Sequence, residues 1–413
     1  MIFLRLTYES FRFAWQALRS NLLRTTLSLL GVTIGIFAII AVLTVVDSLE
    51  RGVKKGMSFL GEKTIYVSKW PFIFTPSTPW WKYFNRPPVN YNEYRYLTRY
   101  VSNTDALAII DDQGNQTFRN GNNSIQGVTV WGTSENYDRV VEIPFAEGRY
   151  FSPLEQEAGR EVAIIGYTIA ETLFPGLDPM GKTFKVKGLK FTVVGTLARQ
   201  GTGVLGGPDF DNTCFVPYKT FEKLFHTRWS EPNIVAKGRE TDPNMDQLEA
   251  ELTGLIRSRR GLRPIEEDNF SINRSEMVMQ AVEGVFSVLT IAGGIIGSFS
   301  ILVGGFGIAN IMFVSVKERT NIIGIQKALG AKNYFILFQF LFEAVFLSIL
   351  GGGAGLLIVY LLTFIPFGDL EVVLSAKNII RGLGVSSVIG ILAGIIPAAA
   401  AGRLDPVIAI RSK

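Results

Sequence analysis

The chain has 413 residues, of which 47% are hydrophobic and only 19% are charged. This is too apolar for a set of ordinary soluble domains, so a large part of the chain is expected to lie in lipid. A single cysteine and a single histidine exclude an internal disulfide and any cysteine-rich or histidine-rich metal centre, and the net charge of +5 is better explained by membrane orientation than by nucleic-acid binding.

The first 20 residues have the pattern of an amphipathic helix. Arg5, Arg12 and Arg19 recur every seven residues and therefore fall near one helical face, while Phe11 and Trp15 are among the apolar residues between them. Such a pattern is typical of a helix that lies in the headgroup layer. We expect residues 1–20 to form a cytoplasmic interfacial helix.

Four apolar stretches are long enough to cross a hydrocarbon core of about 30 Å. The helix-compatible run from Glu276 to Val316 is the longest of them, because as one helix it would measure about 60 Å, twice what the lipid requires. Gly304, Gly305 and Gly307 are places where such a helix could bend. The expected transmembrane segments are 21–47, 276–316 (stalk and span together), 333–365 and 379–401.

Basic residues predict the orientation of these spans. They cluster before the first span, between the second and third, and in the tail 402–413, which places all three regions in the cytoplasm by the positive-inside rule. The long segment 48–275 and the short turn 366–378 then lie outside. The basic residues concerned are Arg5, Arg12, Arg19, Arg24, Lys317, Arg319, Lys327, Lys332, Arg403, Arg411 and Lys413.

Each span carries two glycines four residues apart, and small residues let helix backbones approach in lipid. This pattern predicts a tightly packed bundle, within one chain or across a dimer, and argues against a wide pore. Glu343 is the one acidic residue well inside an apolar run; it could serve a proton or substrate, but an interfacial position bonded to a neighbouring helix is the preferred interpretation. The predicted packing residues are Gly31, Gly35, Gly293, Gly297, Gly351, Gly355, Gly390 and Gly394.

The external segment 48–275 has a mixed α/β pattern. The order strand, helix, strand is expected at 63–69, 90–100 and 105–111, and again at 233–237, 245–260 and 269–273. These flanking units could pair into one α/β subdomain, with 118–225 inserted as a second, strand-rich lobe. Within that lobe the pattern predicts strands at 124–131, 161–165, 183–186, 191–197 and 214–216, and a helix at 168–174.

Several motifs in the external segment carry no predicted chemistry. The run Gly176–Thr183 fits a phosphate-binding P-loop, but an expected helix precedes it and a strand follows, the reverse of what that loop requires, so Gly181 is expected to form a turn. His226 is interpreted as a surface residue and Cys214 as a buried thiol, and no catalytic motif assembles. The aromatic stretch Trp70–Pro88 could be an interface or a loop packed on its own domain. We expect no catalytic, cofactor-binding or metal-binding residues in this chain.

The cytoplasmic loop 317–332 is the most informative segment. Lys317, Glu318 and Arg319 are expected to open a short helix that Gly330 ends. Its apolar face, flanked by charges that include Lys327, needs either the headgroup layer or a partner protein to cover it. That face consists of Ile322, Ile325 and Leu329.

Four segments carry a resemblance to a known family: Ala17–Ile36, the external run EGRYFSPLE to GKTFKVKGLKFTVVGTL, Gly307–Gly352, and Pro397–Arg411. The chain resembles the FtsX-like and MacB-like permeases, the membrane subunits of the mechanotransmission (type VII) class of ABC transporters. The resemblance implies a four-span α-helical bundle with an α+β extracytoplasmic domain, built from a porter-like βαβ subdomain and an inserted lobe. It also implies that Lys317–Leu329 is a coupling helix that docks into an ATPase.

The partners implied by the resemblance follow from this arrangement. The chain carries no ATPase domain of its own, so ATP and magnesium are expected in a separate cytoplasmic ABC ATPase, and the permease would form a homodimer or pair with a related permease in a bacterial inner membrane. The sequence leaves open whether a periplasmic adaptor is a further partner. Two lost carboxylates weaken the transfer of ionic contacts, because Ile322 and Ile408 stand where family members commonly have a glutamate, and Asn321 stands where they commonly have an arginine or lysine.

The hypothesis is therefore a permease that transmits ATP-driven motion to its outer domain for efflux or extrusion of a substrate from the outer side of the membrane. The alternative is an FtsX-like regulator that activates a cell-wall hydrolase or lipoprotein-release machinery without transporting a small molecule. A channel or secondary transporter is disfavoured because the spans lack a set of intramembrane charges.

Overall fold

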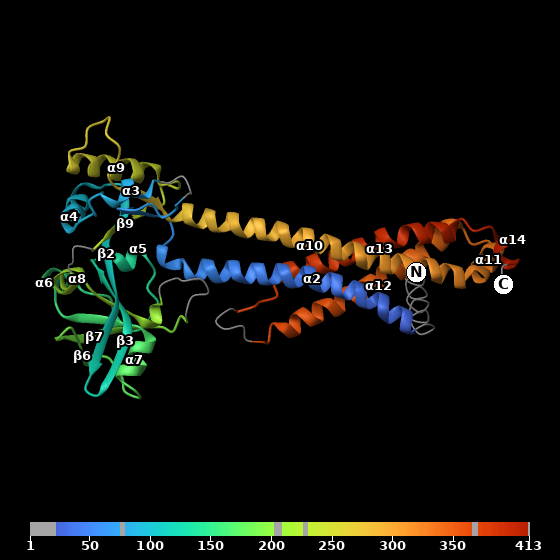
Figure 1. Ribbon diagram of the computed structural model, residues 1–413, viewed down its shortest axis with the longest axis horizontal. Coiled ribbons are helices and arrows are strands. Elements are labelled where there is room, and N and C mark those ends of the chain that lie inside the picture. Colours follow the sequence, from blue (N-terminus) through green and yellow to red (C-terminus); the bar gives the residue numbers. More distant parts are fainter. Residues whose placement is uncertain (1–21, 75–78, 202–208, 226–229, 366–370, 412–413) are drawn as a thin grey trace. The chain divides into compact units, whose positions relative to one another are not determined.

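The computed structural model describes residues 22–74, 79–201, 209–225, 230–365 and 371–411. The predicted interfacial helix 1–20 and His226 lie outside these residues. The chain divides into a helical unit, residues 1–50 and 285–413, and a β-rich unit, residues 51–284. Their elements are labelled in Figure 1.

The described part of the β-rich unit contains one ten-stranded sheet of order β10-β1-β9-β2-β3-β8-β5-β7-β4, with β6 paired to β2 and β7. The pairs β3–β8 and β5–β7 are parallel and the other pairs are antiparallel. The strands are β1 Thr64–Ser68, β2 Thr104–Asn120, β3 Asn123–Thr133, β4 Phe145–Gly148, β5 Val162–Ile165, β6 Thr183–Val186, β7 Leu189–Leu197, β8 Thr213–Pro217, β9 Asn233–Gly238 and β10 Ser271–Arg274.

The two flanking β-α-β units do pair, as the sequence predicts. Their four strands form the adjacent set β10-β1-β9-β2, and α4 and α9 pack together over a shared core with them. The expected lobe boundary at residue 118 is wrong, because β2 continues to Asn120 and its pairing with β3 carries the same sheet into the inserted segment. The helices of this unit are α3 Trp80–Phe84, α4 Tyr91–Tyr100, α5 Tyr137–Val140, α6 Pro153–Ala158, α7 Tyr167–Leu173, α8 Tyr218–Phe225 and α9 Asp246–Arg260, with short 3-10 turns at Ser58–Leu60 and Phe210–Asn212.

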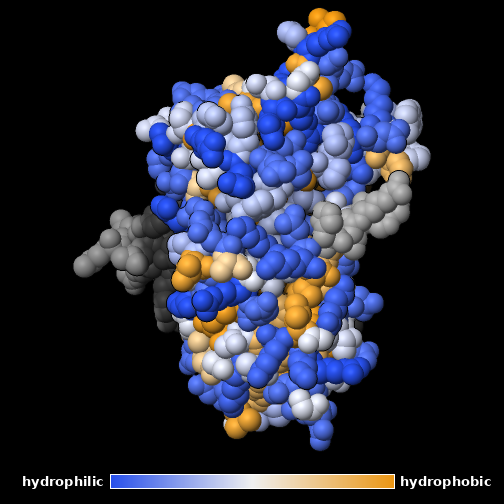
Figure 2. Space-filling model, turned by 90° about the vertical axis from the view of Figure 1, so that its left-hand side faces the viewer, coloured by the Kyte–Doolittle hydropathy of each residue, from blue (hydrophilic) through white to orange (hydrophobic). Residues whose placement is uncertain are grey.

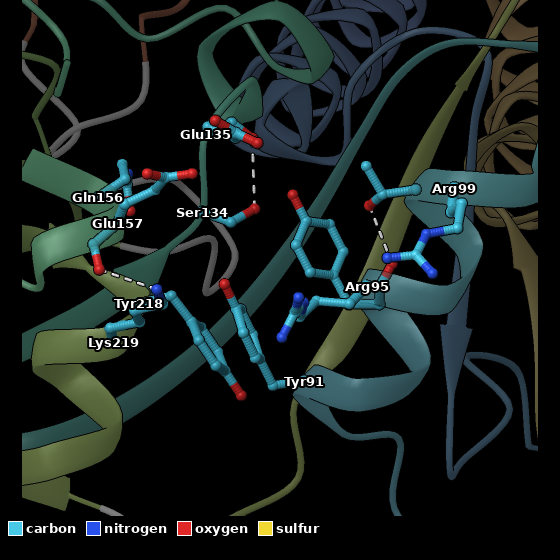
Figure 3. A pocket seen from close by; sticks show the side chains of 11 residues that line it. Tyr91, Arg95, Arg99, Ser134, Glu135, Gln156, Glu157, Tyr218 and Lys219 are labelled. Atoms are coloured by element: carbon cyan, nitrogen blue, oxygen red, sulfur yellow. Dashed lines mark hydrogen bonds between the residues drawn. The ribbon is translucent and has the colours of Figure 1, made fainter. Parts of the chain in front are cut away.

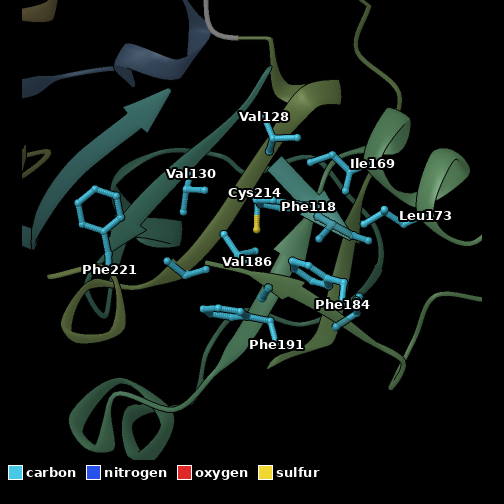
Figure 4. Close-up of a cluster of buried hydrophobic side chains, with 14 of the residues drawn as sticks. Phe118, Val128, Val130, Ile169, Leu173, Phe184, Val186, Phe191, Cys214 and Phe221 are labelled. Atoms are coloured by element: carbon cyan, nitrogen blue, oxygen red, sulfur yellow. The ribbon is translucent and has the colours of Figure 1, made fainter. Parts of the chain in front are cut away.

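The inserted half of the sheet has an apolar core of its own, drawn in Figure 4. Phe118, Phe184 and Phe191 stack in sequence there, with ring centroids 5.0 and 5.9 Å apart. Cys214 of β8 is fully buried in the same cluster, and burial raises the pKa of its thiol, so the predicted buried thiol is confirmed. By contrast, the face of the β-rich unit in Figure 2 is mostly hydrophilic, with a few apolar patches.

Two further sequence interpretations can be compared with the β-rich unit. The P-loop-like run follows α7 and precedes β6, and Gly181 has φ +71°, so the reversed context and the turn are confirmed. The described part of the aromatic stretch 70–88 is partly packed on its own domain and partly exposed. Trp70 Nε1 donates to Glu231 Oε2 at 2.8 Å and its ring stacks on Tyr83, whereas Trp80 and Trp81 are exposed.

In the helical unit, four described helices are long and apolar enough to cross a membrane. α10 is a single unbroken helix of 44 residues that begins directly after β10, so the glycines at 304, 305 and 307 do not interrupt it. The helices that contribute to this unit are α2 Leu22–Gly56, α10 Ser275–Glu318, α11 Thr320–Ala328, α12 Asn333–Leu362, α13 Ala376–Gly402 and α14 Pro406–Arg411.

Glycines occupy the close approaches between these helices. A Cβ added to Gly35 of α2 would lie 2.7 Å from the Ser300 carbonyl oxygen of α10, and one added to Gly351 of α12 would lie 2.8 Å from Val32 of α2. Gly31 differs, because an added Cβ there would meet nothing within 4 Å in the described chain. The remaining glycines of the predicted set also face a neighbouring helix closely: Gly293 meets Val42, Gly297 meets Ile39, Gly355 meets Phe37, Gly390 meets Val345 and Gly394 meets Ala344.

Candidate coupling site

The junction between α10 and α11 is a bend without a loop. α10 ends at Glu318 and α11 begins at Thr320, with Arg319 between them as N-cap. The Thr320 hydroxyl donates to the carbonyl oxygens of Val316 and Lys317, at 3.0 and 2.9 Å. Lys317 and Glu318 therefore belong to the end of α10, and the prediction that they open the short helix is wrong because the hydrogen-bond ladder of α10 continues through them.

Glu343 of α12 fixes this junction. Arg319 Nη1 donates to Glu343 Oε2 at 3.3 Å, and Ser315 Oγ donates to Glu343 Oε1 at 3.4 Å. Both side chains are shielded, with 20% of Arg319 and 4% of Glu343 exposed, so the pair is screened less by water than a surface pair would be. The bond to a neighbouring helix that the sequence predicts for Glu343 is confirmed.

α14 packs along α11 through a glycine. A Cβ on Gly324 would lie 2.8 Å from the Ala409 Cβ and 3.0 Å from the Ile410 backbone nitrogen, so a larger residue would push α14 away. Lys327 Nζ donates to the carbonyl oxygens of Gly402 and Leu404, both at 2.7 Å. This ammonium thus satisfies carbonyls at the end of α13, where a cation also complements the helix dipole.

The two packed helices leave apolar side chains uncovered. On α11 and its C-cap, Ile322, Ile325 and Leu329 are 54%, 47% and 84% exposed. On α14, Val407 and Ile408 are 64% and 70% exposed, whereas Ala409 faces α11 and is buried. We call these five exposed residues the α11–α14 platform. Gly330, with φ +98°, ends the α11 segment as predicted.

Two family models match this chain. Residues 25–255 match the MacB-like periplasmic core domain, and residues 294–406 match the FtsX-like permease C-terminal domain. The chain belongs to the MacB-like and FtsX-like permease family. The second match includes α11 and the first residue of α14, so it covers the platform residues of α11 and ends just before those of α14.

Relatives within the family match almost the whole chain. It is 31% identical to the pyoverdine export ATP-binding/permease protein PvdT of Pseudomonas aeruginosa and 32% identical to the macrolide export ATP-binding/permease protein MacB of Azoarcus sp.. Both matches cover 98% of this chain but only 59% and 60% of the relative. The chain therefore spans about three fifths of the length of these relatives.

Two of the solved structures similar to this family member are isolated external regions. The periplasmic region of MacB from Actinobacillus actinomycetemcomitans is 19% identical, with a TM-score of 0.43 over 54% of this chain and 94% of that one. The extracellular domain of the transporter YknZ from Gram-positive bacteria is also 19% identical, with a TM-score of 0.39 over 51% of this chain and 98% of that one.

Sequence reasoning about the site missed α14. Its signal is present in the sequence, because Asp405 precedes Pro406 and its carboxylate accepts from the Val407 backbone nitrogen at 2.8 Å, a helix-starting arrangement before a short apolar run. Ile408, which departs from the family pattern, is one of the most exposed residues of the platform. Lys327, in contrast, is engaged within the chain.

Proposed function

We propose that this chain is the permease subunit of an ABC transporter and that the α11–α14 platform receives a separate cytoplasmic ATPase. The observation that carries the proposal is the uncovered apolar surface on two short helices that are themselves anchored to α12 and α13. Apolar patches of this kind, flanked by charges, are typical of protein interfaces. The printed names of the relatives, which join ATP binding to a permease, support an ATPase as the partner.

The proposed orientation places α11, α14 and both termini in the cytoplasm. Lys317, Arg319, Lys327 and Lys332 lie in or directly beside α11 in the sequence, and lysine and arginine accumulate on the cytoplasmic side of inner-membrane proteins. The β-rich unit then lies outside the cytoplasm, in agreement with the description of the family model that matches it.

Motion would pass along α10. Its 44 residues correspond to about 66 Å, roughly twice the hydrocarbon thickness. A displacement of α11 would reach α10 through the bend at Arg319 and α12 through Glu343. Because β10 ends at Arg274 and α10 begins at Ser275, the far end of α10 enters the sheet of the β-rich unit directly.

A second permease copy is proposed along α10. This helix has the least buried apolar window of the four spanning helices, at 17% against 28–33% for the others. Phe299, Val303 and Phe306 are among its exposed residues. Lipid or another permease would cover them, and we propose a homodimer or a pair with a related permease.

The proposed transport activity is export of a substrate from the outer side of the membrane. The relatives named for macrolide and pyoverdine export support export over the alternative of a regulator that moves no small molecule. The two functions differ in what should stimulate ATP hydrolysis by the assembled complex, a small exported molecule in one case and a cell-wall hydrolase in the other.

The platform can be tested with Ile325→Asp and Leu329→Asp. A buried leucine contributes about 1.5–3 kcal/mol, so loss of either side chain should weaken ATPase binding about tenfold or more. A candidate ABC ATPase from the same organism would be co-expressed with the chain, and its co-purification and hydrolysis rate would be measured. Ile265→Asp is the matched control, because Ile265 is 91% exposed in the β-rich unit. An unchanged partner yield and hydrolysis rate in both platform variants would contradict the proposal.

A further inference from the structure

The β-rich unit contains a pocket that the proposed function does not use. Its volume is about 480 Å³, within the range of small-molecule sites. Four segments far apart in sequence form it: α4, the turn after β3, α6 and the start of α8 (Figure 3). The lining residues are Tyr91, Tyr94, Arg95, Thr98, Arg99, Ser134, Glu135, Gln156, Glu157, Tyr218 and Lys219.

One wall of the pocket is aromatic. The rings of Tyr91 and Tyr218 are stacked, with centroids 5.5 Å apart and planes 11° from parallel, and Figure 3 draws them side by side. Tyr94 continues this wall, with its ring centroid 5.7 Å from that of Tyr91. Burial raises the pKa of Tyr91, so its phenol stays neutral at physiological pH. Such a wall suits a flat ring, which gains from stacking as well as from burial.

The helix that contributes the largest share of the lining residues, α4, is held rigidly at its start. Asn90 caps α4 through a reciprocal capping box with Glu93. The Glu93 carboxylate also pairs with Arg260 of α9 at 2.7 Å, and both side chains are less than a tenth exposed. Tyr91, Arg95 and Arg99 follow at intervals of four residues, so they share one face of a fixed helix.

A buried hydroxyl in the pocket lacks a hydrogen bond. Tyr94 is only 4% exposed, and its hydroxyl oxygen has no hydrogen-bond partner in the described part of the chain. The Ser134 hydroxyl beside it in the lining accepts from the Ile109 backbone nitrogen at 2.9 Å and donates to the Glu135 carbonyl oxygen at 3.3 Å. The Tyr94 oxygen has almost no accessible surface, so this phenol closes the inner wall of the pocket and does not offer a hydroxyl to a bound molecule.

The basic residues that line the pocket differ in whether they already bond to another part of the chain. Lys219 Nζ donates to the Glu157 carbonyl oxygen at 2.8 Å. Arg95 and Arg99, one helical turn apart, form no ion pair with a carboxylate among the residues that the structure describes. A guanidinium is shaped to bind a carboxylate through two parallel hydrogen bonds. The arginine side of the pocket therefore favours an anionic group.

We propose that this pocket binds a small molecule with a flat aromatic ring and a carboxylate. The ring packs on Tyr91 and Tyr218, and the carboxylate pairs with Arg95 or Arg99. All of these groups lie within the β-rich unit, so binding requires no ATPase and is independent of the proposed function.

The probe is 6-hydroxy-2-naphthoate, titrated by calorimetry into the full chain in lipid nanodiscs without ATPase. We expect saturable binding that is about tenfold weaker for the corresponding amide, which lacks the charge. Arg95→Gln should weaken the acid about tenfold and remove its advantage over the amide. Arg119→Gln, an exposed arginine outside the pocket, is the control and should change nothing.

Thermal unfolding of the unliganded chain separates binding from folding. Arg95 is exposed, so Arg95→Gln should leave the unfolding temperature unchanged while affinity for the acid falls. Tyr100→Phe, on the same helix but outside the pocket, should leave affinity unchanged. Absence of saturable binding, or binding that is indifferent both to charge and to Arg95→Gln, would overturn the proposal.

Discussion

Replacement of Gly390 by alanine should loosen the packing of α13 on α12. An added Cβ would lie 2.7 Å from the Val345 Cα, 3.0 Å from the Ser348 Cβ and 3.1 Å from the Ala344 carbonyl oxygen. Two of these three atoms belong to the backbone of α12, so no side-chain rotation can relieve the contact. Gly384 of the same helix provides the matched control, because a Cβ there would meet nothing within 4 Å in the described chain.

The magnitude follows from the distance. Carbon atoms attract best at about 3.5–4.0 Å, so the two helices would have to separate by about 1 Å near Gly390. A gap of that size removes about a quarter to a half of the dispersion energy at the contact, and overpacking of this kind costs about 1–3 kcal/mol. Alanine at Gly384 should instead gain about 0.5–1 kcal/mol, because it loses less conformational freedom than glycine on forming a helix.

The assay is denaturation of the purified full chain in mixed micelles with increasing sodium dodecyl sulfate, followed by helical circular dichroism. Gly390→Ala should unfold at a lower dodecyl sulfate fraction than the unmodified chain, and Gly384→Ala at an equal or higher one. If Gly390→Ala is as stable as Gly384→Ala, the close approach of α12 and α13 does not depend on the missing side chain and the reasoning is refuted.

Three further predictions concern charge and junction contacts. Burial raises the pKa of Asp111 to about 6, although Ser230 and the Asp112 backbone nitrogen donate hydrogen bonds to its carboxylate. The folded state therefore holds the Asp111 proton more tightly than the unfolded state does. The free energy of unfolding should fall as pH rises from about 4 to 6, by at most about 3 kcal/mol. Asp111→Asn should abolish that slope in thermal unfolding followed by tryptophan fluorescence, and a slope that persists in the variant would assign it elsewhere. Glu343→Gln should cost the α10–α11 junction about 1.5–3 kcal/mol and speed tryptic cleavage after Arg319 in nanodiscs, whereas an unchanged rate would mean that the ion pair does not hold the bend. Gly324→Ala should displace α14 and speed cleavage after Arg403, and equal rates would contradict the close packing against Ala409.

The elements that the sequence predicts well are those set by local patterns. The run that becomes α10 is long, free of proline and without a charge between Glu283 and Lys317, so its single helix follows from hydropathy and length. The strands and helices of the two flanking β-α-β units fall within about two residues of the expected positions, except that β2 extends nine residues beyond its expected end at 111. Alternation and turn residues are local signals, whereas the extension of β2 depends on its pairing with β3.

The parts of the site that sequence reasoning missed depend on contacts between distant segments. Lys327 looks like a free flanking charge, but α11 turns it toward the end of α13, some 75 residues further along the chain. The apolar residues of α14 become part of the platform only because Gly324 lets the two helices touch. The tyrosine-lined pocket has no sequence motif, since α4, α6 and α8 lie far apart in the chain and meet only in the folded unit.

The order of the sheet has a mechanical consequence. β10 and β1 are neighbours at one edge, and the first leads straight into α10 while the second follows α2 after a short connection. From that edge, continuous strand pairing reaches β4 on the opposite side, with the 17 residues of β2 shared by both halves. If the proposed motion of α10 reaches the edge strands β10 and β1, continuous strand pairing would transmit it across the sheet, and the tyrosine-lined pocket would move with the sheet.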